Sequence, residues 1–99
     1  MYMIEIVKSE EFLKWLKGLR DMRAQVRIAK RLDHMEVENF GDCSPIGEGL
    51  SEARIHYGPG YRLYFLRRGE KVIVMLGGGD KGSQKRDIAK AKQLAEKWR

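Results

Sequence analysis

The residues that most constrain the fold lie in the second half of the chain, where two strand-like segments flank the tripeptide Gly58-Pro59-Gly60. Residues 50–57 and 61–67 place apolar and aromatic side chains between polar ones, which is the pattern of a strand with one buried face. Glycine and proline together interrupt a strand and are typical of a tight turn. The sequence therefore predicts an antiparallel hairpin, against which the rest of the chain must pack.

Further strands and helices follow from the spacing of apolar residues. Residues 71–76 contain the run Val-Ile-Val-Met-Leu, which indicates a central strand buried on both faces, and residues 2–7 are expected to form a first strand. Helical spacing predicts a short helix from an N-cap at Ser9 to about residues 18–20, and a second helix over 22–37. The buried stripe of the second helix is expected to comprise Ala24, Ile28, Leu32 and Met35.

The remaining segments complete the fold class. Residues 39–49 contain Pro45 and three glycines and are expected to form a loop, and a last helix is expected over 83–98, capped by Ser83. The order of elements is β-α-α-β-β-β-α in one domain of residues 1–99. This order predicts an α+β protein with a largely antiparallel, four-stranded sheet and its helices packed on one face.

The register of the hairpin decides which side chains share the outer face of the sheet. A three-residue turn places His56 opposite Arg62 and Arg54 opposite Tyr64, and it buries the apolar side chains under the helices. A register slipped by one residue would mix polar and apolar side chains on each face. The preferred register gathers on one outer surface the residues Glu52, Arg54, His56, Arg62 and Tyr64.

This surface carries side chains suited to RNA cleavage. Arg54 and Arg62 can hold a phosphate and stabilise the extra negative charge of its transition state. Histidine titrates near neutrality, so His56 can accept the proton of a ribose 2′-hydroxyl, and Tyr64 offers a ring for base stacking. The alternative interpretation is that the open face of an antiparallel sheet is polar without any function.

The formal net charge of +6 is unevenly distributed along the chain. Basic residues concentrate in 20–31 and 81–99, whereas 36–52 contain acidic residues and no Lys or Arg. This segregation favours a polyanionic partner such as nucleic acid, or an acidic protein, over ordinary solubility charge. The single Cys43 excludes a disulfide framework and fits the reducing cytoplasm, and no apolar run is long enough to span a membrane.

Residues 77–82 match the spacing of glycine motifs that bind nucleotides. Too few residues follow for a second strand with a ribose-binding acid, and Ser83 stands where a phosphate-binding loop needs lysine. The segment is either a plain strand-to-helix turn or a backbone nest that receives phosphate beside Lys81, and we favour the nest. The histidines and the cysteine lack metal-ligand spacing, so we expect no metal and no cofactor.

Three segments of the chain resemble a known family: LSEARIHYGPGYRLYF (50–65), LGGGDKGSQ (76–84) and DIAKA (87–91). Together with residues 39–42 and 47–49, they are similar to the addiction-module killer proteins, the HigB-like branch of the RelE/ParE toxin superfamily. The resemblance covers most of the chain, and the predicted order of strands and helices is similar to that of the family.

The resemblance implies a toxin of a type II toxin–antitoxin system that acts in the cytoplasm. Such a toxin cleaves messenger RNA at the ribosome without a metal, and a helix-turn-helix antitoxin neutralises it in an oligomeric complex. The resemblance also implies that Arg54, Arg62 and Lys81 are the family's basic residues, with Glu52 and Tyr57 as their recurrent neighbours.

The chain departs from the family pattern at three points. Ala53 stands where leucine is usual, and Gly82 stands where serine is usual. Some HigB toxins end in an acid-aromatic-histidine cluster that takes part in cleavage, whereas this chain continues into the helix expected over 83–98. That absence leaves the catalytic role of His56 open.

Three functions remain open from the sequence. The chain is a ribonuclease toxin, a ParE-like inhibitor of DNA gyrase that acts by binding, or a non-enzymatic nucleic-acid-binding module. The grouping of Arg54, His56 and Arg62 favours the ribonuclease, because gyrase inhibition requires no proton-transfer group. The predicted catalytic residues are Arg54, Arg62 and His56, and the predicted substrate-binding residues are Lys81, Tyr64, Tyr57 and Glu52.

Overall fold

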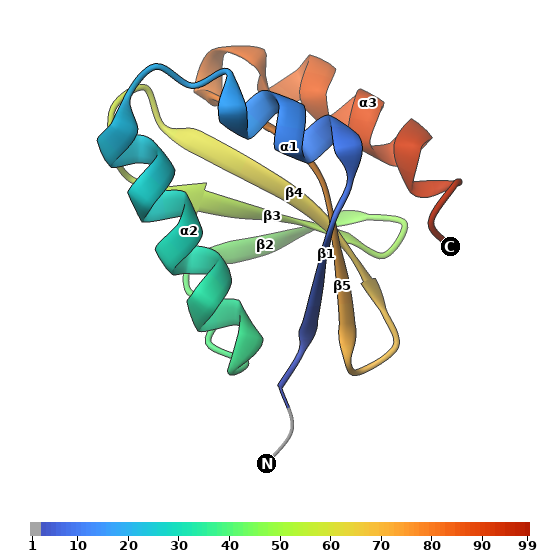
Figure 1. Cartoon of the computed structure of the whole chain (residues 1–99). Helices are drawn as coiled ribbons and strands as arrows, with labels where there is room; N and C mark the ends of the chain where they lie inside the picture. Colours follow the sequence, from blue (N-terminus) through green and yellow to red (C-terminus); the bar gives the residue numbers. More distant parts are fainter. Residues whose placement is uncertain (1–2) are drawn as a thin grey trace.

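The computed structural model describes residues 3–99, which form a five-stranded sheet and three α-helices (Figure 1). The strands are β1 (Glu5–Lys8), β2 (Cys43–Gly47), β3 (Leu50–Ile55), β4 (Tyr61–Arg68) and β5 (Val72–Gly79). The helices are α1 (Glu10–Lys17), α2 (Met22–Glu36) and α3 (Gln84–Ala95), and a 3-10 turn over Lys81–Ser83 precedes α3. The sheet order is β1-β5-β4-β3-β2, in which β1 is parallel to β5 and all other neighbours are antiparallel. The predicted α+β class is confirmed, with one strand more than expected.

Side-chain caps start the first two helices. Ser9 Oγ accepts a hydrogen bond from the backbone N–H of Phe12 at 3.1 Å, as predicted, and Asp21 Oδ1 accepts one from the N–H of Arg23 at 2.9 Å. Within residues 3–99, no helix is long and apolar enough to cross a membrane. The predicted buried stripe of α2 is confirmed at Ala24, Ile28, Leu32 and Met35.

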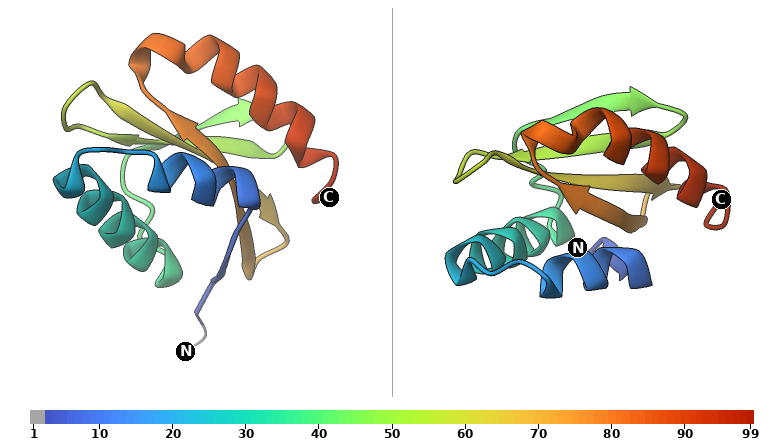
Figure 2. Two further views of the ribbon diagram at one scale, coloured as in Figure 1. Left: turned by 45° about the horizontal axis from the view of Figure 1, so that its top comes forward. Right: turned by 90° about the horizontal axis from the view of Figure 1, so that it is seen from above.

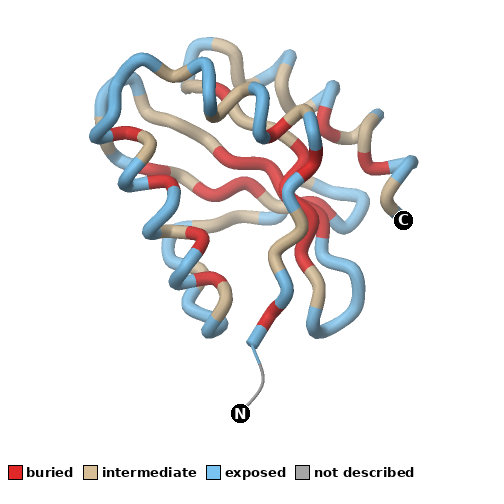
Figure 3. Tube along the Cα trace, in the orientation of Figure 1, coloured by how far each residue is buried: buried red, intermediate tan, exposed pale blue. Residues whose placement is uncertain are grey.

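Helices cover both faces of the sheet, which corrects the prediction that they all lie on one face. Figure 2 shows α1 and α2 on one side and α3 on the other. Strand β4 contributes to both cores, because Leu63 and Phe65 pack with α1 and α2, whereas Tyr64 and Leu66 pack with α3. All four side chains are buried, and the buried residues follow the middle of the sheet in Figure 3. The central strands β4 and β5 are therefore buried on both faces, as predicted for β5.

Strand β2 occupies a segment for which the sequence predicts a loop. Cys43 pairs with Ala53 and Pro45 pairs with Ser51, which places β2 at the edge of the sheet. An edge strand tolerates proline because one of its sides needs no N–H donors, and a register shift between Pro45 and Gly47 interrupts the pairing. This strand was not predicted because it contains proline and glycine, which are depleted in strand interiors.

Element boundaries differ from the prediction near both ends of the chain. The strand predicted over residues 2–7 is observed as β1 from Glu5 onward, and residue 2 lies outside the described residues. The predicted Ser83 cap is absent from α3, where the side chain of Ser83 forms no capping bond. Ser83 instead closes the 3-10 turn together with Asp80.

The observed hairpin register differs by two residues from the predicted one. Arg54 pairs with Arg62 rather than with Tyr64, and residues 56–60 form the loop. Because side chains alternate with a period of two, this shift leaves every side chain of the hairpin on its predicted face. That face is covered in part by α3, however, and is not the open surface that the sequence indicates.

The glycine run at the end of β5 allows two helices to approach the strand closely. A Cβ atom at Gly78 would overlap the ring of Trp15 in α1, and a Cβ atom at Gly79 would overlap the carboxylate of Asp87 in α3. At Gly77 a Cβ atom would meet nothing within 4 Å. Two of the three glycines are thus required by packing.

We expect Gly78→Ala to destabilise the protein by about 1–3 kcal/mol, because the added methyl group displaces the Trp15 ring from a packed core. Gly77→Ala is the matched control, since it adds the same methyl group to the same strand in open space. Its effect should stay below about 0.5 kcal/mol. Urea unfolding followed by circular dichroism measures both variants. Equal midpoints would show that Trp15 does not limit the space at Gly78.

Candidate functional site

A buried carboxylate lies at the centre of the predicted site. Glu52 in β3 is 3% exposed, and its Oε2 accepts hydrogen bonds from Arg54 Nη1 at 3.1 Å and from Arg62 Nη1 at 3.4 Å. Its Oε1 accepts a hydrogen bond from Nε2 of Gln84, the first residue of α3, at 2.6 Å. One negative charge therefore holds two guanidinium groups from neighbouring strands. We call Glu52, Arg54, Arg62 and Gln84 the Glu52 cluster.

Arg54 links the Glu52 cluster to the edge of the sheet. Its Nε and Nη2 donate to Asp42 Oδ2 and Oδ1 at 3.2 and 2.8 Å, and Nη2 also donates to Ser44 Oγ at 2.7 Å. These bonds from Arg54, and a further one from His56, hold the pKa of Asp42 well below its usual range. The bonds to Asp42 likewise raise the pKa of Arg54. Arg54 and Asp42 therefore form a charged pair at neutral pH.

His56 approaches the same carboxylate from the hairpin loop. Its Nε2 lies 2.6 Å from Asp42 Oδ2, and its side chain is 75% exposed. Within residues 3–99, its other ring nitrogen, Nδ1, has no hydrogen-bond partner. A carboxylate that holds one nitrogen of a histidine orients the ring and leaves the second nitrogen for proton transfer.

Arg62 is the less saturated of the two arginines. Its side chain is 13% exposed, and its one ion pair among the described residues is the 3.4 Å contact with Glu52. Its Nε is buried and has no hydrogen-bond partner within residues 3–99. Arg62 therefore retains more hydrogen-bonding capacity than Arg54, which is bonded to Asp42, Ser44 and Glu52.

The sequence assigns Tyr64 and Tyr57 to substrate binding, but the structure shows both packed against other parts of the protein. Tyr64 is fully buried beneath α3, so its ring cannot serve as an exposed stacking surface, and burial, aided by the charge of Glu52, raises the pKa of its hydroxyl. Tyr57 packs against the core under α1 and α2, where its hydroxyl donates to Asp21 at 2.8 Å and Arg27 lies 4.5 Å from its ring centre. Tyr57 thus holds the hairpin loop to the start of α2.

The glycine-rich segment does not form the predicted phosphate nest. Asp80 Oδ1 already accepts hydrogen bonds from the N–H groups of Gly82 and Ser83, at 2.8 and 3.2 Å. The carboxylate of the chain itself therefore occupies the anion position of this turn. Lys81 is exposed in the turn, and its Cβ lies close to Gly60 in the hairpin loop. Lys81 is thus close to the hairpin loop, but it does not lie beside a backbone nest that is free to bind phosphate.

Three polar residues that complete the site, Asp42, Ser44 and Gln84, were not predicted from the sequence. Asp42 and Ser44 are two residues apart, a spacing that places both side chains on one face of a strand, but the expected loop concealed this pattern. Gln84 has no sequence signal beyond its place at the start of the last helix. Within residues 3–99, no group of three or more His, Cys, Asp or Glu residues is placed to hold a metal ion.

We expect Glu52→Gln to destabilise the protein by about 3 kcal/mol, because it removes the shared partner of two partly buried guanidinium groups. Glu96→Gln is the matched control, since Glu96 is 68% exposed and forms one ion pair at 3.7 Å with Arg99. The control should change the free energy of unfolding by less than about 0.5 kcal/mol. Urea unfolding measures both. A loss at Glu52 no larger than that at Glu96 would contradict the central role of Glu52.

Comparison with known proteins places this arrangement in a family and a fold. No protein-family model matches the chain. An uncharacterized protein of Haemophilus influenzae is 38% identical over 93 residues, which cover 94% of each chain. A mutant of the E. coli toxin RelE, solved in the free state, superposes with a TM-score of 0.72 and 18% identity over 94% of this chain and 97% of RelE. The chain therefore belongs to the same family as the Haemophilus influenzae protein and has the RelE fold.

Proposed function

We propose that the whole chain is the toxin of a type II toxin–antitoxin pair, of the HigB-like branch, and that it cleaves messenger RNA at the ribosome in the cytoplasm. The observation that carries the proposal is the Glu52 cluster, in which a buried carboxylate holds two arginine side chains beside a histidine–aspartate pair. The RelE fold supports it, because the solved relative is a toxin. No metal or cofactor enters the proposed reaction.

Arg62 is the residue that we assign to charge stabilisation. During cleavage the ribose 2′ oxygen attacks phosphorus, the bond from phosphorus to the 5′ oxygen breaks, and the phosphoryl oxygens gain negative charge. A guanidinium group that is already oriented stabilises this charge without reorganisation. Arg62 suits the role because Glu52 fixes it and is its one ion-pair partner among the described residues, whereas Arg54 also bonds to Asp42 and Ser44. Arg54 assists by its charge and anchors β2.

His56 is the proposed proton acceptor for the 2′-hydroxyl. Asp42 orients the ring through Nε2, and the exposed Nδ1 side can reach an RNA ribose from solvent. The leaving 5′ oxygen takes its proton from solvent. Lys81, at the hairpin loop, contributes a phosphate contact, and Glu52 acts as the positioning residue for both arginines.

An antitoxin partner fits the outer surface of α2. Met22 and Val26 are 68% and 66% exposed there, and Arg23, Arg27 and Lys30 flank them. Exposed apolar side chains ringed by cations suit an acidic amphipathic segment, which is the chemistry expected of a helix-turn-helix antitoxin that masks a basic toxin. Arg54 and Arg62 are less available to such a segment, because Asp42 and Glu52 already pair with them.

The proposed function is tested by inducing the chain in a bacterial host and following macromolecular synthesis. We expect growth to stop, protein synthesis to fall before DNA synthesis, and primer extension to reveal new 5′ ends in a reporter messenger RNA. If DNA synthesis falls first while messenger RNA stays intact, the chain acts as a gyrase inhibitor and the proposal is wrong. If growth continues, the chain is a binding module without toxicity.

We expect Arg62→Ala to lower RNA cleavage by about a hundredfold or more, the scale seen when an oriented charge-stabilising donor is removed. Arg62→Lys should restore part of the activity, because lysine keeps the charge but lacks the planar fork of donors. Cleavage of a labelled RNA by purified protein gives the rates, and circular dichroism verifies the fold. A folded Arg62→Ala variant with full activity would place the reaction elsewhere.

We expect Val26→Glu to weaken capture of the cognate antitoxin, because a carboxylate on α2 repels an acidic segment and removes apolar contact area. Co-purification of the tagged antitoxin measures the loss. Lys85→Glu on α3 is the control with a larger change of charge, and it should leave capture intact. Equal losses in both variants would indicate a general charge effect and not a docking surface on α2.

A further inference from the structure

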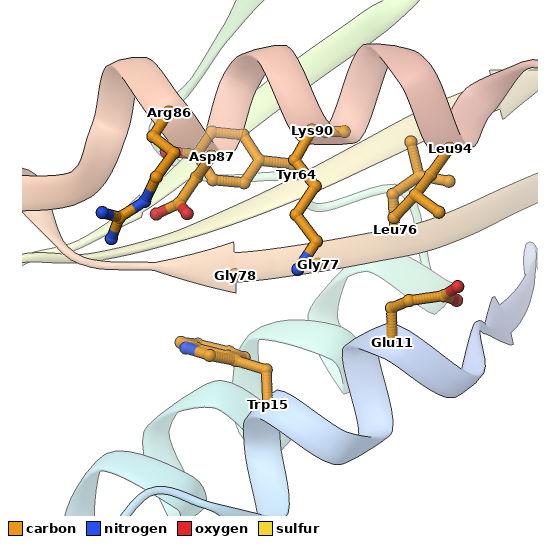
Figure 4. A pocket seen from close by; sticks show the side chains of 11 residues that line it. Glu11, Trp15, Tyr64, Leu76, Gly77, Gly78, Arg86, Asp87, Lys90 and Leu94 are labelled. Carbon is orange, nitrogen blue, oxygen red and sulfur yellow. The ribbon is translucent and has the colours of Figure 1, made fainter.

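A pocket of about 290 Å³ opens at the edge of β5, beyond the point where β1 leaves the sheet (Figure 4). Strand β1 ends at Lys8, which pairs with Met75, so the later residues of β5 have no strand on that side. Helices α1 and α3 flank the opening, and Figure 4 shows their side chains on either side of it. The lining residues that matter here are Glu11, Trp15, Tyr64, Gly77, Arg86 and Lys90.

Tyr64 and Gly77 belong to the part of the pocket wall that the sheet forms. The side chain of Tyr64 is fully buried, and its hydroxyl has no hydrogen-bond partner within residues 3–99. Gly77 pairs with Tyr64 across the sheet and leaves open space where a side chain would lie. The room for a ligand therefore lies beside Gly77, and the covered Tyr64 side chain closes the pocket there.

The other lining side chains have the chemistry of a nucleotide site. Trp15 supplies an aromatic wall, on which any nucleobase can stack. Arg86 and Lys90 lie four residues apart on α3, are exposed, and form no ion pair within residues 3–99, so they can hold a phosphate. The Glu11 carboxylate can accept a hydrogen bond from the amino group of a base.

We propose that this pocket binds one unpaired RNA base that carries an exocyclic amino group. The base stacks on Trp15, its amino group meets the Glu11 carboxylate, and its phosphate lies at Arg86 and Lys90. The volume is at the lower end of the range for ligand pockets, which suits a single base and not a longer segment. This inference rests on the proposed RNA-cleaving function and adds a base preference to it.

The test uses the full chain with Trp98→Phe, so that Trp15 is the remaining tryptophan and its fluorescence reports on the pocket. The probes are 2′-O-methyl tetracytidylate and tetrauridylate, which cannot be cleaved through the 2′ oxygen. We expect tetracytidylate, whose bases carry the amino group, to quench Trp15 and to bind about tenfold more tightly than tetrauridylate. Equal binding of the two probes would overturn the proposed base preference.

Two variants and a control locate the binding. Gly77→Val fills the open space, and we expect it to weaken tetracytidylate binding by at least about tenfold, the scale of one lost stacking contact. Lys90→Ala should weaken binding more than Lys85→Ala, which removes the same charge from α3 outside the pocket.

The outcomes separate this inference from the proposed function. Arg62→Ala should lose cleavage and keep the preference for tetracytidylate, since Arg62 lies outside the pocket. If Gly77→Val binds tetracytidylate as tightly as the parent chain while Arg62 remains essential for cleavage, the pocket assignment alone is wrong. If Gly77→Val loses the antitoxin and not RNA, the pocket anchors a protein side chain, which also overturns it. If the parent chain neither binds nor cleaves RNA, both proposals fall.

Discussion

The hydrogen bonds of the buried Glu52 carboxylate hold the candidate site together. A carboxylate at 3% exposure is tolerated only when other groups compensate its charge, and here two guanidinium groups and one amide do so. The bonds connect β3 with β4 and with the start of α3, and Arg54 extends them through Asp42 to the edge of the sheet. The positions of the strands and of the charged groups therefore depend on each other.

The two arginines of this network differ in how many partners they bind. Arg54 bonds to Asp42, Ser44 and Glu52, so its main effect is to hold the edge strand. Arg62 has a single carboxylate partner among the described residues, Glu52, although its side chain is less exposed than that of Arg54, at 13% against 25%. Because a group that must stabilise new charge needs free hydrogen-bonding capacity, the structure favours Arg62 over Arg54 for that task.

Local patterns in the sequence predicted the two strands of the hairpin and the face on which each side chain lies. They did not predict that α3 covers one of these faces. The faces survived a register shift of two residues because side chains alternate with a period of two. The run Leu63–Leu66 carries the signal that β4 is buried on both sides, yet the polar neighbours of Tyr64 suggested an open face. In the structure α3 covers Tyr64, on the face of the sheet opposite α1 and α2. No local sequence pattern could place α3 on that face.

The residues of the candidate site that belong to one hairpin were predictable from the sequence, whereas the residues from other segments were not. Glu52, Arg54 and Arg62 come from one hairpin, so alternation was sufficient to group them. Gln84 reaches Glu52 from the start of α3, 32 residues along the chain, and Asp42 reaches Arg54 from a segment that was predicted to be a loop.

In the proposed reaction, Glu52 acts in cleavage by positioning Arg62. The most direct measurement is a double-mutant cycle of Glu52→Gln and Arg62→Ala on the RNA cleavage rate, at a temperature where all four proteins are folded. We expect Glu52→Gln to lower the rate strongly in the parent chain and little once Arg62 is gone. Equal fold-losses in both backgrounds would show that the two residues act independently, and would contradict a positioning role for Glu52.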